Sequence, residues 1–189
     1  MMAVGVSLVL GAMLAPVQAQ VGDYEINAVN SSVNFKVSYL GVGRVRGHFG
    51  DISGKVHFDT EHPEKSLISV VIKAASVDTG IKGLDNHLRG EGFFNVDKFP
   101  NISFKSTSLE REAPGVYKLT GDLTLLKKTQ KIATSLMDAG EVVGEDGKMR
   151  RHGKLADIVI KRSDYGMTGM LGPVGDKITL YIEYSALKK

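Results

Sequence analysis

The polar residues best placed for chemistry lie in one short stretch, where Asp85, His87 and Arg89 occupy alternate positions. A carboxylate beside an imidazole could transfer protons, and a guanidinium could bind a phosphate or carboxylate group. Arg46, much earlier in the chain, is a further cation of this kind. Arg89 and His87 also have a structural alternative, in which Arg89 clamps Asp85 or Asp78 and holds its own segment in place.

The sequence gives little support for thiol, serine or metal chemistry. The chain contains no cysteine, which excludes a thiol nucleophile, a disulfide and a cysteine metal site. Ser163 precedes Asp164, but no Gly-x-Ser-x-Gly motif surrounds it and no histidine is close in sequence. The histidines show no metal-ligand spacing; they are His48, His57, His62, His87 and His152. We therefore predict no metal site and no catalytic residue.

The charge of the chain gives no indication of a nucleic-acid partner. Lys and Arg number 24 against 21 Asp and Glu, which gives a net charge of +3. Acidic and basic residues are mixed along the sequence, so the charge is too weak and too dispersed to indicate nucleic-acid binding.

The first residues have the pattern of an export signal. An apolar run from Val4 to Leu14 is followed by Ala19 at the expected cleavage point. We expect residues 1–19 to be a signal peptide and residues 20–189 to form one domain outside the cytoplasm. A buried hydrophobic helix is the alternative for the apolar run.

The elements that would position the polar candidates are mostly strands. Apolar residues from Val33 to Tyr39 alternate with polar ones, as a strand with one wet face requires. The same alternation recurs along the chain and predicts eight to nine strands joined by short turns. Such a pattern is typical of an antiparallel sandwich or a closed barrel.

Two stretches break the alternation. Ile81, Leu84 and Leu88 recur at helical spacing, which predicts a short amphipathic helix over residues 81–90. Residues 138–153 are rich in Gly, Glu, Lys and Arg, and we expect them to form a loop.

Several motifs carry a resemblance to a known family. They are Val45-Arg46-Gly47, Ala75-Ser76-Val77-Asp78-Thr79, Asp85-Asn86-His87-Leu88-Arg89, Phe93 to Pro100, Phe104-Lys105-Ser106-Thr107, Gly121-Asp122-Leu123-Thr124 and Lys161-Arg162-Ser163-Asp164-Tyr165-Gly166. In this order they resemble the YceI-like family of bacterial periplasmic proteins. The resemblance implies a mainly β fold, a lipocalin-like eight-stranded antiparallel barrel with a short helical insertion. It also implies a periplasmic location and an elongated apolar pocket for polyisoprenoid or fatty-acyl lipids.

The chain departs from the family pattern at a few positions. A turn that usually contains His-Gly-Val-Thr-Lys-Pro here reads Leu126 to Lys131, and Lys127 would be strained if that turn needs a positive φ. Lys154 stands where an aromatic residue is usual, and the chain has no Trp. We expect the changes at Leu126, Lys127, Lys128 and Lys154 to alter the pocket at one end.

The expected function is that of a carrier which sequesters a polyisoprenoid or other long-chain lipid, of the quinone or prenyl phosphate type. The predicted apolar pocket residues are Phe35, Val37, Phe49, Phe94, Phe104, Leu119, Leu123, Tyr165 and Met170, and the predicted contacts to a polar head are Arg46, His87 and Arg89. No cofactor is expected apart from the bound lipid. Transient membrane contact and a homodimer remain open, as do two other functions: an enzyme using His87 with Asp85, or a stress-related interaction protein whose inward residues form a closed core.

Overall fold

A computed structural model describes residues 21–189 of the chain. The predicted signal peptide, residues 1–19, lies outside the described residues. Within the described part the chain forms twelve strands, one α-helix and four short 3-10 helices.

The strands are β1 (Val21–Ile26), β2 (Ser32–Tyr39), β3 (Gly43–Phe49), β4 (Ile52–Asp59), β5 (Leu67–Lys73), β6 (Val77–Asp78), β7 (Asn101–Ala113), β8 (Val116–Leu125), β9 (Lys128–Val143), β10 (Met149–Leu155), β11 (Ile158–Lys161) and β12 (Val174–Lys188). The helices are α1 (Lys82–Arg89) and the 3-10 turns η1 (Ala28–Asn30), η2 (Pro63–Lys65), η3 (Ala74–Ser76) and η4 (Arg162–Tyr165). The helix predicted over residues 81–90 is confirmed.

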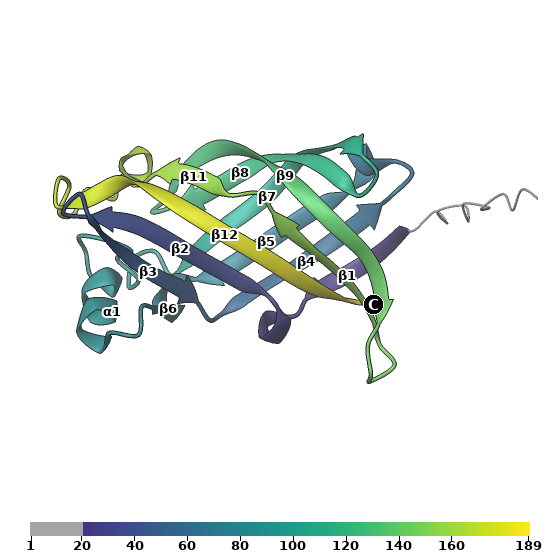
Figure 1. Ribbon diagram of the computed structural model, residues 1–189, viewed down its shortest axis with the longest axis horizontal. Helices are drawn as coiled ribbons and strands as arrows, with labels where there is room; N and C mark the ends of the chain where they lie inside the picture. The colour runs from purple at the N-terminus through teal and green to yellow at the C-terminus, as the bar shows by residue number, and fades with distance from the viewer. Residues whose placement is uncertain (1–20) are drawn as a thin grey trace, which may run out of the picture.

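These strands close into an eight-stranded antiparallel barrel, as predicted (Figure 1). The order β1-β4-β5-β7-β8-β9-β10-β12 returns to β1 through the pairing of Tyr24 with Lys188 and of Ile26 with Ala186. The shorter pieces extend four of these strands: β2 follows β1 along β12, β3 leads into β4, β6 follows β5, and β11 follows β10 along β12. Closure leaves few unpaired strand edges.

Alternation of inward and outward residues explains why these segments form strands. Along β8, Tyr117, Leu119, Leu123 and Leu125 are buried, while the residues between them are more exposed. Gly121 continues the inward series, since a Cβ atom there would lie 2.4 Å from the ring of Phe104. The inner surface of the barrel is therefore lined by apolar side chains.

The β8–β9 hairpin carries the first departure from the family pattern. Leu126 has a φ of 51° and Lys127 a φ of 61°, so both central residues of this two-residue turn lie in the left-handed region. This is the conformation in which hairpins favour Asn and Gly. The positive φ on which the predicted strain at Lys127 depends is therefore present.

The prediction of a loop over residues 138–153 is wrong. Strand β9 continues to Val143, β10 begins at Met149, and the two pair from Met149–Val143 onward with one register shift near His152. Part of its polar character comes from Asp138 and Arg151, which pair with each other inside the barrel end, and part from Asp146 and Arg150, which pair at the hairpin turn.

Candidate functional site

The barrel encloses a cavity of about 440 Å³, within the range of about 300–1,000 Å³ common for small-molecule sites. Its walls come from all of the barrel strands and from α1, and nearly every lining side chain is apolar. The polar or partly polar exceptions are Tyr39, His87, Thr134, Arg162 and Tyr184. Such a cavity suits a ligand that is itself mostly hydrocarbon.

Most of the predicted pocket residues line this cavity. They are Phe35, Val37, Phe49, Phe94, Phe104, Leu119, Leu123 and Met170. Three of the aromatic rings pack together. The ring centroid of Phe49 lies 5.8 Å from that of Phe35 and 5.4 Å from that of Phe94, which it meets edge to face. Their contact with a ligand stays a prediction.

Tyr165 is the predicted pocket residue that does not line the cavity. It is buried in the surrounding core, and its hydroxyl has no hydrogen-bond partner. Burial, and secondly the nearby charge of Asp164, raises the pKa of Tyr165 to about 12. The side chain therefore supports the wall from behind.

The cavity opens at the end of the barrel that carries α1. There its lining includes exposed side chains, among them Met170, Tyr39 and His87. In Figure 1, α1, the end of β2 and the loop before β12 lie together at this end. The Leu40 N–H donates to the Pro173 carbonyl at 2.8 Å, which ties the β2–β3 turn to that loop. We refer to this end as the mouth.

Arg89 holds the helix in place. Its Nε donates to the Ala75 carbonyl and its Nη2 to the Val77 carbonyl, both at 2.8 Å, and its Nη1 donates to Asn86 Oδ1 at 3.2 Å. It does not line the cavity. The clamp expected as the alternative is therefore present, but its acceptors are backbone carbonyls and Asn86 rather than Asp85 or Asp78.

Asp85 secures the start of the same helix. Its Oδ1 accepts hydrogen bonds at 2.7 Å from both the backbone N–H and the hydroxyl of Thr79. These bonds, led by that of the hydroxyl, lower the pKa of Asp85. His87 instead packs its ring edge to face on Phe93, with centroids 5.0 Å apart. Asp85 and His87 form no hydrogen bond with each other, so the structure does not bring these two residues together as the acid–base pair considered from the sequence.

Arg46 lies outside the barrel. Strand alternation turns Val45 toward the cavity, and Arg46 therefore points to the outer surface. There it lines a shallow depression together with Lys36, His48 and Asp78. Of the three predicted head-group residues, only His87 borders the cavity.

Lys154 also faces outward. It is exposed on β10 opposite Glu183, and its neighbour Leu155 lines the cavity instead. The expectation that Lys154 alters the pocket is wrong, because alternation places its side chain on the other face of the sheet.

The most unusual lining residue is Arg162, which is 1% exposed. Its guanidinium donates to the backbone carbonyls of Gly169 (2.7 Å), Val174 (3.0 Å), Gly175 (3.0 Å) and Met167 (3.1 Å). No carboxylate of the described residues forms an ion pair with it, and burial lowers its pKa. Arg162 thus fastens the loop that forms one side of the mouth.

Arg162 belongs to one of the family motifs in the sequence, but no role was predicted for its side chain. The signal was present: Ile158 and Ile160 are buried and line the cavity, so Arg162 occupies the next inward position of the same series.

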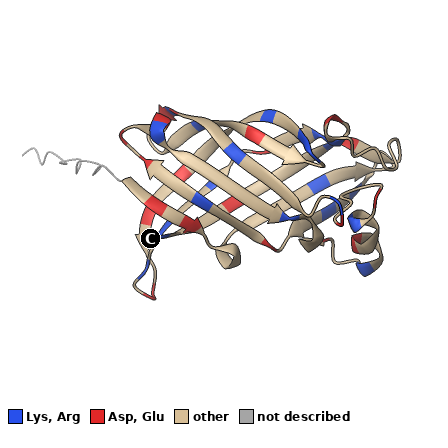
Figure 2. Cartoon of the chain, turned by 180° about the vertical axis from the view of Figure 1, so that it is seen from behind, with Lys and Arg blue, Asp and Glu red and all other residues tan. Residues whose placement is uncertain are grey.

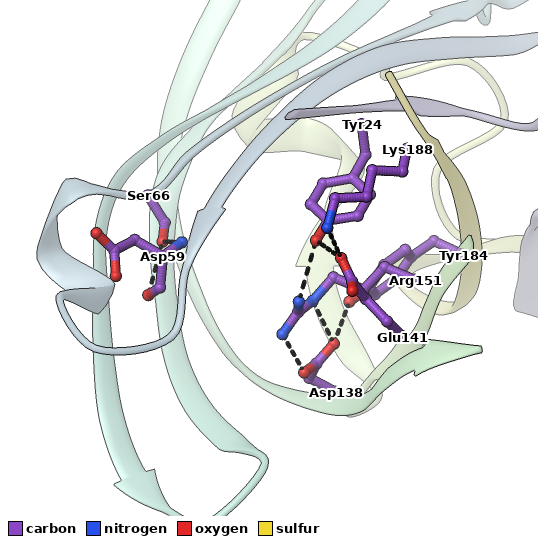
Figure 3. Close-up of polar contacts among 8 residues, drawn as sticks. All are labelled: Tyr24, Asp59, Ser66, Asp138, Glu141, Arg151, Tyr184 and Lys188. Atoms are coloured by element: carbon purple, nitrogen blue, oxygen red, sulfur yellow. Dashed lines mark hydrogen bonds and ion pairs between the residues drawn. The ribbon is translucent and has the colours of Figure 1, made fainter. Parts of the chain in front are cut away.

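The opposite end of the barrel is closed by a cluster of polar residues (Figure 3). Arg151, 1% exposed, binds Asp138 through Nε–Oδ1 at 2.9 Å and Nη2–Oδ2 at 2.6 Å. The Tyr184 hydroxyl donates to Asp138 at 3.2 Å. The Arg151 guanidinium also stacks 3.8 Å from the centroid of Phe58. This buried group plugs the end away from α1.

A second layer of the same cluster lies around Glu141. It accepts hydrogen bonds from Tyr24 and from Lys188, the latter at 2.8 Å. Burial alone would raise the pKa of Glu141, but these two bonds, together with the charges of Lys188 and Arg151, lower that pKa. Burial, followed by the bond to Glu141, raises the pKa of Tyr24 to about 12.

Outside the cavity, charges of both signs alternate over the side of the barrel shown in Figure 2. Between residues 21 and 189, no three His, Asp or Glu side chains gather closely enough to hold a metal ion. In the same part of the chain, no helix has the length and apolar character needed to cross a membrane.

Comparison with known proteins agrees with this architecture. The YceI-like domain matches residues 24–186. A UPF0312 protein of Ectopseudomonas mendocina is 35% identical over 185 residues, covering 97% of this chain and 96% of that protein. The solved structure of a Campylobacter jejuni YceI protein is 32% identical with a TM-score of 0.71, covering 80% of this chain and 90% of the other.

A more distant structure shares the fold. It is a polyisoprenoid binding domain from Saccharophagus degradans, 15% identical with a TM-score of 0.68, covering 90% of this chain and all of that one. The match over nearly the whole described barrel, together with relatives above 30% identity, shows that the chain belongs to the YceI-like family.

Proposed function

We propose that this protein binds a long, predominantly apolar lipid in its barrel and acts as a periplasmic carrier that performs no chemistry on its cargo. The observation that carries the proposal is the cavity, which is apolar along its length, plugged at one end and open beside α1. The name of the related S. degradans domain supports a polyisoprenoid as the chemical class of ligand. The export signal pattern of residues 1–19 supports the periplasm.

The size of the cavity favours an occupant. An apolar wall that faces an open cavity lacks the packing contacts of a filled core. A lipid chain in the cavity would supply such contacts and would contribute about 0.8 kcal/mol for each buried CH₂ group. A bound lipid should therefore stabilise the folded barrel.

The direct test is native mass spectrometry of protein purified without detergent, followed by solvent extraction and identification of the extracted lipid. We expect a mass above that of the bare mature chain. Repeated preparations that contain only the bare chain would overturn the proposal.

A matched pair of variants makes the test specific. Ile132 lines the cavity from β9, whereas its neighbour Ala133 is exposed on the outer face. Ile132→Trp should reduce lipid occupancy by filling the cavity, while Ala133→Trp should leave it unchanged. Equal occupancy in the two variants would place the lipid elsewhere.

A further inference from the structure

Exposed apolar side chains surround part of the mouth. Leu40 and Val42 on the β2–β3 turn are 62% and 92% exposed, and Met170 and Leu171 on the loop before β12 are 48% and 42% exposed. The hydrogen bond from Leu40 to Pro173 brings the two loops together. We call these four residues the apolar tips.

Two of the apolar tips have an uncommon backbone conformation. Leu40 has a φ of 49° and Met170 a φ of 51°, a region that residues other than Gly, Asn and Asp rarely adopt. Residues in such conformations occur often at binding sites. Here the conformation presents two large apolar side chains to the solvent at the cavity entrance.

The barrel wall next to the apolar tips is cationic. In the strand register, Lys36 on β2 lies directly opposite Arg46 on β3, and Lys161 on β11 lies directly opposite Lys177 on β12. Like charges in directly opposed positions destabilise a sheet. None of these four cations forms an ion pair with another described residue.

Two carboxylates lie near these cations. Asp78 borders the depression that contains Lys36 and Arg46, and the charge of Lys161 acts on Asp176. The four cations of the wall outnumber these two carboxylates, which leaves an excess of positive charge beside the apolar tips.

We propose that the mouth docks on an anionic lipid bilayer, with the apolar tips inserted among the headgroups and the cationic wall facing the surface charge. Apolar anchors combined with Lys and Arg are the combination that binds proteins reversibly to anionic membranes. The cavity would then open toward the source of its lipid, because Met170 belongs both to the tips and to the cavity lining. Docking would extend the proposed carrier function, and its purpose depends on that function.

A second copy of the chain fits this face less well. A symmetric dimer through the mouth would bring two cationic walls together. A stable interface also buries about 800 Å² on each partner, more than four side chains on two loops supply. An anionic lipid surface satisfies both features of the face at once.

The test is co-sedimentation of the full mature protein with vesicles of phosphatidylcholine alone or with added phosphatidylglycerol. We expect binding to the mixed vesicles that weakens as salt is raised. Val42→Asp should weaken it about tenfold, because it places a charge at the inserted edge. Val29→Asp is the matched control, since Val29 is 90% exposed on η1, and it should have no effect.

A second pair of variants tests the charges. Arg46→Gln with Lys161→Gln should reduce binding to the mixed vesicles about tenfold or more. Lys55→Gln with Lys118→Gln, which remove the same charge from β4 and β8, should not. Equal binding by both double variants, or equal binding to neutral vesicles, would overturn the proposal. A dimer whose formation is abolished by Val42→Asp would overturn it in favour of self-association.

Failure of docking and failure of the carrier function give different results. Val42 does not line the cavity, so Val42→Asp protein should still carry lipid by native mass spectrometry. Lipid-loaded protein that ignores the vesicles contradicts docking alone, and bare protein that binds them contradicts the carrier function alone.

Discussion

Arg151 on β10 and Asp138 on β9 share two hydrogen bonds of 2.9 and 2.6 Å, although the strand register places Arg151 opposite Glu141 and Asp138 opposite Gly153. Both side chains are almost fully buried, with exposed fractions of 1% and 5%. A buried ion pair contributes little net stability compared with apolar residues, but an isolated buried charge is very costly. The pair therefore makes the closed end of the barrel sensitive to the loss of either partner.

Asp138→Ala should lower the free energy of unfolding by about 3–5 kcal/mol, because it leaves the Arg151 charge buried without its carboxylate. Denaturant unfolding followed by circular dichroism measures the change. Glu91→Ala is the control: it removes an exposed ion pair with Lys98 and should cost no more than about 1 kcal/mol. A similar small loss for Asp138→Ala would show that the pair is not buried as described.

Arg162→Met should loosen the loop at the mouth. The substitution leaves four backbone carbonyls without their donor, at a cost on the order of 3 kcal/mol. Hydrogen exchange by mass spectrometry should show that residues 166–176 exchange faster in the variant than in the unchanged protein. Exchange over β7 and β8 should be the same in both. Unchanged protection of that loop would contradict the role of Arg162 as its fastener.

Lys127→Gly should stabilise the barrel by about 0.5–1 kcal/mol, because a non-glycine residue at this φ costs about 1–2 kcal/mol, part of which is offset by the greater entropy of unfolded glycine. Thermal unfolding measures the gain. Lys118→Gly, in the middle of β8, should have the opposite sign. A loss of stability on both substitutions would exclude strain at Lys127.

Alkaline pH should reveal the buried tyrosines. The pKa of Tyr24 and of Tyr165 is raised in the folded state from 10.0 to about 12. Their contribution to stability is therefore complete below pH 10 and is lost as the pH rises from about 10 toward about 12. Absorbance titration of tyrosinate should show these two groups ionising late, or together with unfolding.

Tyr165→Phe provides the control for that titration. It should remove one late ionisation and should not reduce stability at neutral pH, because the hydroxyl that it deletes has no partner. Ionisation of all tyrosines near pH 10 in the folded protein would contradict their burial.

Much of the fold could be predicted because strands and helices each leave a local pattern of apolar residues in the sequence. Alternation of apolar and polar residues identified the strands, and the spacing of Leu84 and Leu88 identified the helix. Closure into a barrel depended on the family resemblance, since alternation alone is equally compatible with a sandwich. Most of the predicted apolar lining followed from the same alternation.

The polar residues were harder to place, because their roles depend on contacts between distant parts of the chain. Asp138 and Arg151 look like loop residues until β9 and β10 pair. Arg46 and Arg162 are both arginines in strand-like segments, yet one points outward and the other inward. The phase of the alternation distinguishes them, and charge alone does not.

The plug formed by Arg151 and Asp138 gives the barrel a direction. A lipid of the proposed kind would enter at the mouth tail first, and its head would remain beside Met170 and His87. If the protein is the proposed carrier, unloading would retrace the same path, and the part that entered last would leave first. An acceptor could thus recognise the head of the cargo while the tail is still hidden from water.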